Sequence, residues 1–237
     1  ASNEDGSEGG SGSTASGTLN GAGSSAQEAA VAAWKKEFQT ANPNVTVNYD
    51  PVGSGGGREQ FLAGGVTFAG SDSYLTDEEL ATAKETCKGD IVEIPTYVSP
   101  IAVIYNLDGV DKLNLSPKTI GSIFEGTITK WNDPAITADN PDAKLPDSAI
   151  TAVHRSDDSG TTKNFADYLF QNAPDVWTEK PADPFPYATG EAAQGTSGVV
   201  DAVTNGTNTI GYADASKAGD LGTAAIQVGT EFVNYSA

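Results

Sequence analysis

Residues 150–162 read ITAVHRSDDSGTT and place a short apolar strand directly before an amphipathic helix. The pattern predicts the strand over residues 150–153 and the helix over residues 161–171. Arg155 and a Ser-Gly-Thr turn at residues 159–161 lie between them. N–H groups at the start of a helix carry a partial positive charge, and nearby hydroxyl and guanidinium groups add further donors. The stretch therefore predicts a strand-turn-helix unit that can hold a tetrahedral oxyanion.

The same alternation of short strands and helices begins at Gly17, and it is typical of an α/β fold with mostly parallel sheets. Residues 131–149 are expected to form a surface loop, and residues 174–190 form a second polar, proline-rich segment. The character of the chain changes near residues 96–99, where we place a crossover between two domains. Further strands are expected at residues 18–20, 45–49, 66–69, 91–94, 99–105, 209–212 and 224–228. Further helices are expected at 26–40, in a short stretch that follows Arg58 and runs through Leu62, at 76–86, after Pro117, and through Val203.

Three helix starts have capping signatures. Ser25–Glu28 and Thr76–Glu79 each fit a capping box. Ser116-Pro117 supplies an N-cap followed by a first-turn proline. In the helix expected at 26–40, large apolar residues that include Trp34 and Phe38 recur at helical spacing and share one face.

The charge of the chain restricts the class of partner. There are 13 basic and 32 acidic residues among 237, for a net charge of -19. Such a chain repels polyanions, which argues against nucleic acid or an anionic membrane surface as a partner. A small anion can still bind where local dipoles and one buried arginine outweigh the screened surface charge. A recessed site is therefore expected.

The N-terminal sequence is expected to be a tether. Residues 1–16 consist mainly of glycine, serine and acidic residues and lack any large apolar side chain. The chain has no methionine, so we expect a processed or engineered product. No apolar run approaches the roughly 20 residues of a membrane span, which favours a secreted or lipid-anchored protein, with an engineered linker as the alternative. Cys87 is the only cysteine and is expected to be a lone thiol near a helix end, unless its partner lies outside this sequence.

Three glycine-rich turns supply hydroxyl groups at helix starts: residues 23–25, 53–57 and 159–161. Each alone is typical of an ordinary N-cap, but together with Arg155 they indicate an anion site. Asp72, at the end of a strand, fits such a site if the anion carries a proton, because a carboxylate accepts a hydrogen bond from a protonated oxyanion. Fully ionised sulfate has no proton to donate, so Asp72 would reject it.

Four segments together resemble the substrate-binding proteins of phosphate ABC transporters, and the resemblance extends over nearly all of residues 17–235. The segments are GAGSSA at 21–26, VGSGGGREQF at 52–61, FAGSDSYL at 68–75 and VHRSDDSGTT at 153–162. The resemblance implies a two-lobed α/β fold of the periplasmic-binding-protein type II class, with the ligand in the cleft between the lobes. Lobe one would comprise residues 17–97 and lobe two residues 98–237. Family members continue past the position of Ala237, so lobe one is expected to lack its C-terminal part.

The resemblance also assigns site residues. Asp157 matches an acid that orients the arginine. The family usually has Thr-Phe where this chain has Ser25-Ala26, a change that keeps the hydroxyl and removes an aromatic wall. The positions that match phosphate ligands are Ser25, Ala26 through its N–H, Ser54, Asp72, Arg155, Ser159, Gly160 and Thr161.

The function that the resemblance implies is high-affinity binding of inorganic phosphate and its delivery to an ABC-type permease. It implies an extracytoplasmic monomer, in the periplasm or held on the outer face of the membrane as a lipoprotein by a removed N-terminal anchor. It implies neither catalysis nor a cofactor or metal.

Several alternatives stay open. Arsenate shares the protonation and size of phosphate, whereas Asp72 argues against sulfate and molybdate. A phosphate sensor or a surface adhesin could use the same fold. A phosphatase-like enzyme is the alternative activity, because His154 lies near Asp157 and Ser159. No Gly-x-Ser-x-Gly elbow occurs, and we expect a structural role for His154.

Overall fold

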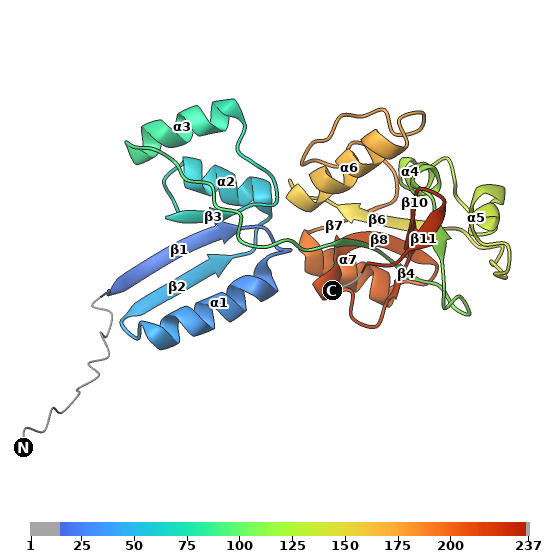
Figure 1. Cartoon of the computed structure of the whole chain (residues 1–237), viewed down its shortest axis with the longest axis horizontal. Coiled ribbons are helices and arrows are strands. Elements are labelled where there is room, and N and C mark those ends of the chain that lie inside the picture. Colours follow the sequence, from blue (N-terminus) through green and yellow to red (C-terminus); the bar gives the residue numbers. More distant parts are fainter. Residues whose placement is uncertain (1–14, 236–237) are drawn as a thin grey trace, which may run out of the picture.

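The computed structural model of the chain describes residues 15–235. Two groups of elements lie side by side and are joined by residues 88–100, which form neither helix nor strand (Figure 1). We call them the first lobe, β1 to α3, and the second lobe, β4 to β11. The predicted domain boundary between residues 97 and 98 stays a prediction. The tether predicted for residues 1–16 lies outside the described residues, except for its last two.

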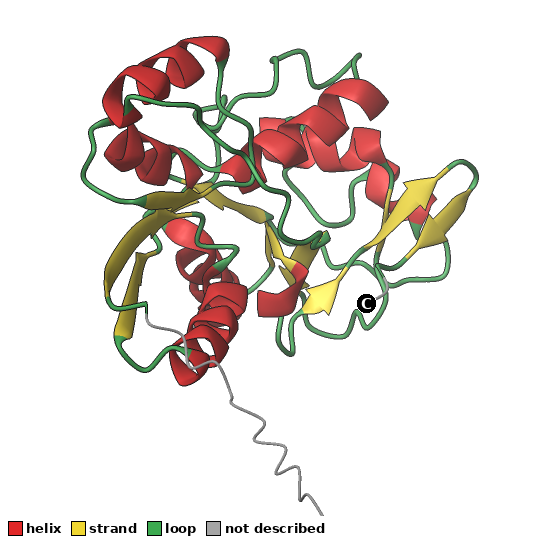
Figure 2. Cartoon of the chain, turned by 60° about the vertical axis from the view of Figure 1, so that its left-hand side comes forward, coloured by secondary structure: helices red, strands yellow, loops and turns green. Residues whose placement is uncertain are grey.

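The first lobe is a three-stranded parallel sheet with helices on both sides (Figure 2). β1 (Gly17–Gly23) lies between β2 (Val45–Asp50) and β3 (Phe68–Gly70). α1 (Glu28–Ala41) lies along one side, and α2 (Ser54–Leu62) and α3 (Asp77–Cys87) lie along the other. Because the strands are parallel, their carboxyl ends fall on one edge of the sheet, and the turns that follow them meet there.

The second lobe is built on a five-stranded sheet in the order β7-β6-β8-β4-β9. Its strands are β4 (Ile101–Asn106), β6 (Thr151–Arg155), β7 (Glu191–Ala193), β8 (Thr209–Asp214) and β9 (Gly222–Thr223). A smaller sheet joins β5 (Asn114–Leu115), β10 (Ala225–Val228) and β11 (Glu231–Val233). The helices are α4 (Pro117–Glu125), α5 (Pro134–Asp139), α6 (Gly160–Asn172), α7 (Gly195–Asn205) and the 3-10 turn η1 (Ala215–Lys217).

The prediction of mostly parallel sheets holds only for part of the molecule. In the second lobe β6 runs parallel to β7 and β8, but β4 is antiparallel to both β8 and β9. The sheet is therefore mixed. A β4 that runs opposite to β8 brings the chain into the lobe from the side that faces the first lobe (Figure 1).

The apolar core lies in the second lobe. Trp131, Trp177 and Phe124 are almost fully buried there in one large cluster, and a second cluster packs β4, β6 and β8 against α7. In the first lobe the buried apolar side chains are small: Ala22, Ala26, Val45, Val47 and Ala83. The apolar face predicted for α1 is not buried, and Trp34 and Phe38 are 43% and 44% exposed.

Two local predictions were wrong. Residues 91–94 form no strand, and Val92 and Ile94 are exposed, because no strand within residues 15–235 is placed to pair with their backbone groups. The loop predicted at 131–149 contains α5, which begins where the Asp133 carboxylate accepts a hydrogen bond from the Ala135 N–H at 2.9 Å.

A third correction concerns the helix starts. The predicted capping box at Ser25 is absent, because α1 begins at Glu28 and its N-cap residue, Gln27, makes no side-chain cap. The capping box of Thr76 and Glu79 and the N-cap of Ser116 before Pro117 are confirmed. Among the helices of the described residues, none combines the length and the apolar character needed to cross a membrane.

Candidate functional site

Asp72 lies at the centre of the contacts on the first-lobe side of the site. It follows β3, and its side chain accepts hydrogen bonds from Ser24 Oγ at 2.5 Å and from Gln27 Nε2 at 3.1 Å. Its N–H donates to Ser54 Oγ at 3.1 Å. These contacts come from the turns that follow β1, β2 and β3, so the edge of the parallel sheet brings the three turns together. The carboxylate is held by short bonds within its own lobe.

The start of α6 closes over Asp72 from the second lobe. Asn164 Nδ2 donates to the Asp72 carbonyl at 2.8 Å, and Thr161 Oγ1 lies 3.4 Å from Asp72 Oδ2. A Cβ atom at Gly160 would lie 2.7 Å from Ser54 Oγ and 2.8 Å from Asp72 Cβ. Only glycine fits between the lobes at this position without displacing a neighbour. The structure therefore brings Ser54, Asp72, Gly160 and Thr161 together.

Arg155 ends β6, and only 3% of its surface is exposed. Its Nε donates to Asp157 Oδ1 at 2.7 Å and its Nη2 donates to Asp157 Oδ2, which forms a bidentate pair. The N–H of Gly195 donates to the same Oδ1 at 3.0 Å. Hydrogen bonds within residues 15–235 thus use Nε and Nη2 of Arg155, while Nη1 has no such bond and can serve an anion.

The carboxyl group of Asp157 is held in its ionised form. Burial by itself raises the pKa of this group, but the hydrogen bond and charge of Arg155 and the N–H of Gly195 hold the pKa below its usual value of 3.8. A Cβ atom at Gly53, which has φ of 94°, would lie 2.4 Å from Asp157 Oδ2. The turn before α2 therefore approaches the arginine pair of the opposite lobe, and the glycine permits that approach.

Ser159 is the N-cap of α6. Its Oγ accepts a hydrogen bond from the Thr162 N–H at 3.1 Å, and its own N–H donates to the Asp183 carbonyl at 3.1 Å. Tyr212 holds the turn between β6 and α6 at both ends. Its hydroxyl accepts a hydrogen bond from the Arg155 N–H at 3.2 Å and contacts Thr162 Oγ1 at 2.7 Å. Burial raises the pKa of Tyr212 to about 12, so the phenol stays neutral and can keep both contacts.

Ser25 and Ala26 lie at the same gap but face α7. Ser25 Oγ accepts from the Thr196 N–H at 2.9 Å and lies 3.0 Å from Thr196 Oγ1. The N–H of Ala26 donates to Ser24 Oγ at 3.1 Å. The hydroxyl that would have completed the predicted capping box is thus engaged by the second lobe. Among the described residues neither Ser25 nor Ala26 makes a hydrogen bond to Asp72, whereas Ser24 links Ala26 to it.

Sequence reasoning missed several residues that the structure places here. Ser24, Gln27, Asn164 and Thr196 make the contacts above, and the sequence offered only a weak signal for Ser24 and Thr196, which belong to turns at helix starts. The predicted recessed position agrees with the structure, since seven of the eight predicted ligand positions are buried. These are Ser25, Ala26, Ser54, Arg155, Ser159, Gly160 and Thr161.

His154 makes packing and backbone contacts. His154 is buried, its Nδ1 lies 2.9 Å from the Arg155 carbonyl, and its ring stacks on Phe185 at 3.9 Å. It makes no hydrogen bond to a serine or threonine hydroxyl in the described part of the chain. Residues 15–235 also contain no cluster of His, Cys, Asp and Glu side chains that could bind a metal ion.

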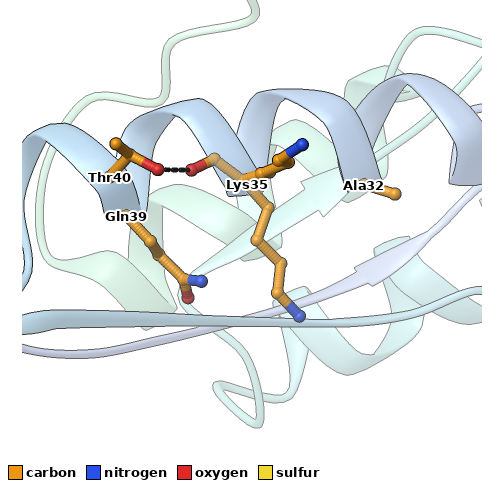
Figure 3. A pocket seen from close by; sticks show the side chains of 5 residues that line it. Ala32, Lys35, Gln39 and Thr40 are labelled. Atoms are coloured by element: carbon orange, nitrogen blue, oxygen red, sulfur yellow. Dashed lines mark hydrogen bonds between the residues drawn. The ribbon is translucent and has the colours of Figure 1, made fainter.

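A separate hollow of about 420 Å³ lies beside α1 and is lined by Ala32, Lys35, Lys36, Gln39 and Thr40 (Figure 3). The Thr40 hydroxyl donates to the Lys36 carbonyl at 2.8 Å. All five lining residues belong to α1, in which no residue is buried.

Known proteins resemble the chain in sequence and in fold. Phosphate-binding protein PstS 3 of Mycobacterium tuberculosis is 40% identical over 195 residues, which cover 82% of this chain and 53% of the relative. Phosphate-binding protein PstS of Xylella fastidiosa is 34% identical over 204 residues, covering 84% of this chain and 54% of the relative. The chain thus spans about half the length of the curated relatives it matches.

Solved structures share the fold at lower identity. A high-affinity periplasmic phosphate-binding protein, PfluDING, bound with phosphate, matches 90% of this chain and 62% of its own with a TM-score of 0.71 and 23% identity. A phosphate-binding protein of Stenotrophomonas maltophilia matches 89% of this chain and 65% of its own with a TM-score of 0.67 and 22% identity. The predicted α/β binding-protein fold is confirmed. Residues 9–234 match the family model of a PBP superfamily domain, and the chain therefore belongs to the PBP superfamily.

Proposed function

We propose that the chain binds inorganic phosphate between its two lobes. One observation carries the proposal: the hydroxyls of Ser24, Ser54 and Thr161 converge on Asp72 Oδ2 at 2.5, 3.4 and 3.4 Å. Asp72 Oδ2 is thus a hydrogen-bond acceptor, and it is surrounded by hydroxyl donors from both lobes at the place where we expect the anion. That combination suits an oxyanion that still carries a proton.

The chemistry assigns the residues to different roles. Arg155 would donate to two phosphate oxygens through its remaining N–H groups, in an orientation fixed by Asp157. The first-turn N–H groups of α6, with Ser159, Gly160 and Thr161, would add donors at a helix start. Ser54, Ser25 and the N–H of Ala26 would complete the set from the first lobe. Asp72 would accept the proton of the anion and so reject fully ionised sulfate.

The wider function is part of the same proposal. We infer that the whole protein works outside the cytoplasm as a monomer, closes on phosphate by a hinge in residues 88–100 and delivers it to an ABC permease without catalysis. Curated relatives are named phosphate-binding proteins, which supports the ligand. A lipid anchor beyond the described N-terminus would hold the protein at the membrane.

Isothermal titration with phosphate tests the proposal directly. Protein freed of phosphate is titrated with phosphate alone, with phosphate in excess sulfate, and with arsenate. We expect tight binding that sulfate does not compete away, and arsenate binding as a second ligand. Failure of folded protein to bind phosphate would refute the function.

Asp72→Asn tests the selectivity. The amide keeps the shape of the side chain but can donate as well as accept, so phosphate should bind more weakly or sulfate should begin to compete. Asp147→Asn is the matched control, because Asp147 is an exposed acid that pairs with Lys130 within the second lobe. Unchanged affinity and unchanged selectivity in Asp72→Asn would remove Asp72 from the site.

A further inference from the structure

A second buried arginine lies outside the proposed anion site. Arg58 on α2 is 8% exposed, and its Nε donates to Glu79 Oε1 at 3.0 Å. Its Nη1 donates to Ser73 Oγ at 2.9 Å and to Ser71 Oγ at 3.1 Å, and its Nη2 donates to Asp183 Oδ2 at 2.5 Å. All three nitrogens are thus engaged by protein groups. Arg58 is therefore unlike Arg155, which keeps Nη1 for an anion.

The partner across the gap belongs to the second lobe. Asp183 is buried in the segment between α6 and β7, and its Oδ1 also accepts from Ser73 Oγ at 3.3 Å. Its carbonyl accepts the N–H of Ser159 at 3.1 Å. One residue therefore contacts the first lobe through its carboxylate and the N-cap of α6 through its backbone.

The segment that carries Asp183 is fixed to the second lobe. Trp177 lies fully buried in the main core, and its ring packs edge-on against Tyr187 at 4.9 Å. Phe185, two residues after Asp183, stacks on His154 at 3.9 Å. These anchors keep the carboxylate with the second lobe. If the lobes separate, the pair with Arg58 must break.

The ion pair is well shielded from solvent. The side chains of Arg58 and Asp183 are 10% and 9% exposed, so salt screens their attraction only weakly. Burial alone lowers the pKa of Arg58, but the bonds and charges of Asp183 and Glu79 raise it overall, and the guanidinium stays charged. Glu79 and the hydroxyls of Ser71 and Ser73 remain with Arg58 in an open molecule, because all belong to the first lobe. Of the contacts that Arg58 makes, only the one with Asp183 depends on closure of the lobes.

We propose that the Arg58–Asp183 ion pair is an interlobe latch, which holds the lobes closed and slows release of the bound anion without touching it. The inference rests on the proposed function for its effect on phosphate. Its effect on lobe separation does not depend on the ligand. The Asp183 carbonyl keeps its bond to the Ser159 N–H when the lobes separate, because both residues belong to the second lobe.

The test compares Asp183→Asn with Glu79→Gln. Each substitution removes one acidic partner of Arg58, but only the first lies across the gap. We expect Asp183→Asn to speed phosphate release by about tenfold or more in stopped-flow measurements, because most of a broken closed-state contact appears in the dissociation rate. Glu79→Gln should leave the release rate within about twofold of the unchanged protein.

A second measurement needs no phosphate. Small-angle scattering of the phosphate-free proteins should give a larger radius of gyration for Asp183→Asn than for Glu79→Gln. If Asp183→Asn does not fold, Ser73→Ala removes a weaker contact to the same carboxylate and should speed release in the same direction.

The outcomes separate the two hypotheses. If the unchanged protein binds no phosphate, the proposed function fails, and scattering alone decides the latch: equal radii overturn it. If phosphate binds and Asp183→Asn releases it no faster than Glu79→Gln does, the latch is wrong and the function stands. A double-mutant cycle with Arg58→Gln gives a further check, since a latch requires the two effects on release to be non-additive.

Discussion

The two lobes differ in how much apolar surface they bury. The second lobe encloses Trp131 and Trp177 completely in its core, whereas α1 of the first lobe buries no residue and leaves Trp34 43% exposed. Yet both lobes supply residues to the gap around Asp72, and the first-lobe turns are as ordered by hydrogen bonds as those of the second. The difference teaches that polar turns at the edge of a parallel sheet can be held by hydrogen bonds even where little apolar area is buried beneath them.

The largest expected effect is on stability, and it tests whether the core really resides in the second lobe. Trp131→Ala removes a fully buried ring and its Nε1 hydrogen bond to the Asn208 carbonyl. We expect a loss of about 3–5 kcal/mol in the free energy of unfolding, measured by urea denaturation. Trp34→Ala is the matched control in the first lobe and should cost below about 1 kcal/mol. Similar losses for both tryptophans would break the comparison.

Arg155→Ala should have the next largest effect, and it falls on binding. Loss of two charge-assisted hydrogen bonds predicts a weakening of phosphate binding by about 3 kcal/mol, roughly a hundredfold in the dissociation constant. Titration calorimetry measures it. Lys163→Ala removes a positive charge from the same helix, α6, and serves as the control. A change below tenfold for Arg155→Ala would contradict its place in the site.

Acid should weaken both lobes through different carboxylates. Burial raises the pKa of Glu79, but the Thr76 N–H and Arg58 lower it overall from 4.5, and the pKa of Asp157 is likewise held below 3.8. A lowered folded-state pKa gives stability that is present above the unfolded value and is lost as pH falls through the folded value. The free energy of unfolding should therefore decline below about pH 4.

Glu79→Gln sharpens that prediction for the first lobe. Glutamine can still complete a capping box, so the helix start should persist while the titrating group is gone. The variant should show a shallower decline of stability with acid than the unchanged protein in urea titrations at several pH values. A parallel decline would assign the acid sensitivity to the second lobe alone.

The smallest effect compares the two helix caps. Thr76→Ala removes the side-chain oxygen that accepts from the Glu79 N–H at 3.2 Å in the first lobe, and Ser116→Ala removes the one that accepts from Thr119 at 3.3 Å in the second. Each should cost about 1 kcal/mol. In Thr76→Ala, hydrogen exchange should show reduced protection of backbone amides in α3 only. Loss of protection throughout the molecule would mean that the first lobe is more cooperative than its thin core suggests.

Local patterns predicted the elements whose cause is local. The strand-turn-helix at residues 150–171 and the caps at Thr76 and Ser116 depend on neighbours within a few residues. The strand at 91–94 was wrong because strand formation needs a partner strand, which sequence periodicity does not provide. The α5 helix was missed because a short run behind Asp133-Pro134 has little apolar pattern.

The site shows the same limit. The predicted ligand positions were read from turn composition and a family resemblance, and their role in anion binding stays a prediction. The contacts that sequence reasoning missed join distant parts of the chain: Ser25 meets Thr196, and Arg58 meets Asp183. Ser25 looked like a capping residue because its partner lies in the other lobe. Pairings of this kind depend on how the lobes meet, which no local pattern encodes.

Cys87 gives this molecule a single site for thiol labelling. It is the last residue of α3, it is exposed, and the sequence contains no other cysteine. A maleimide dye coupled there would travel with the first lobe, while Trp131 and Trp177 would serve as energy donors in the second. Trp34 lies in the first lobe with the dye, so Trp34→Phe would remove its contribution to the signal. The efficiency of energy transfer would then follow the distance between the lobes in real time, without any engineered thiol.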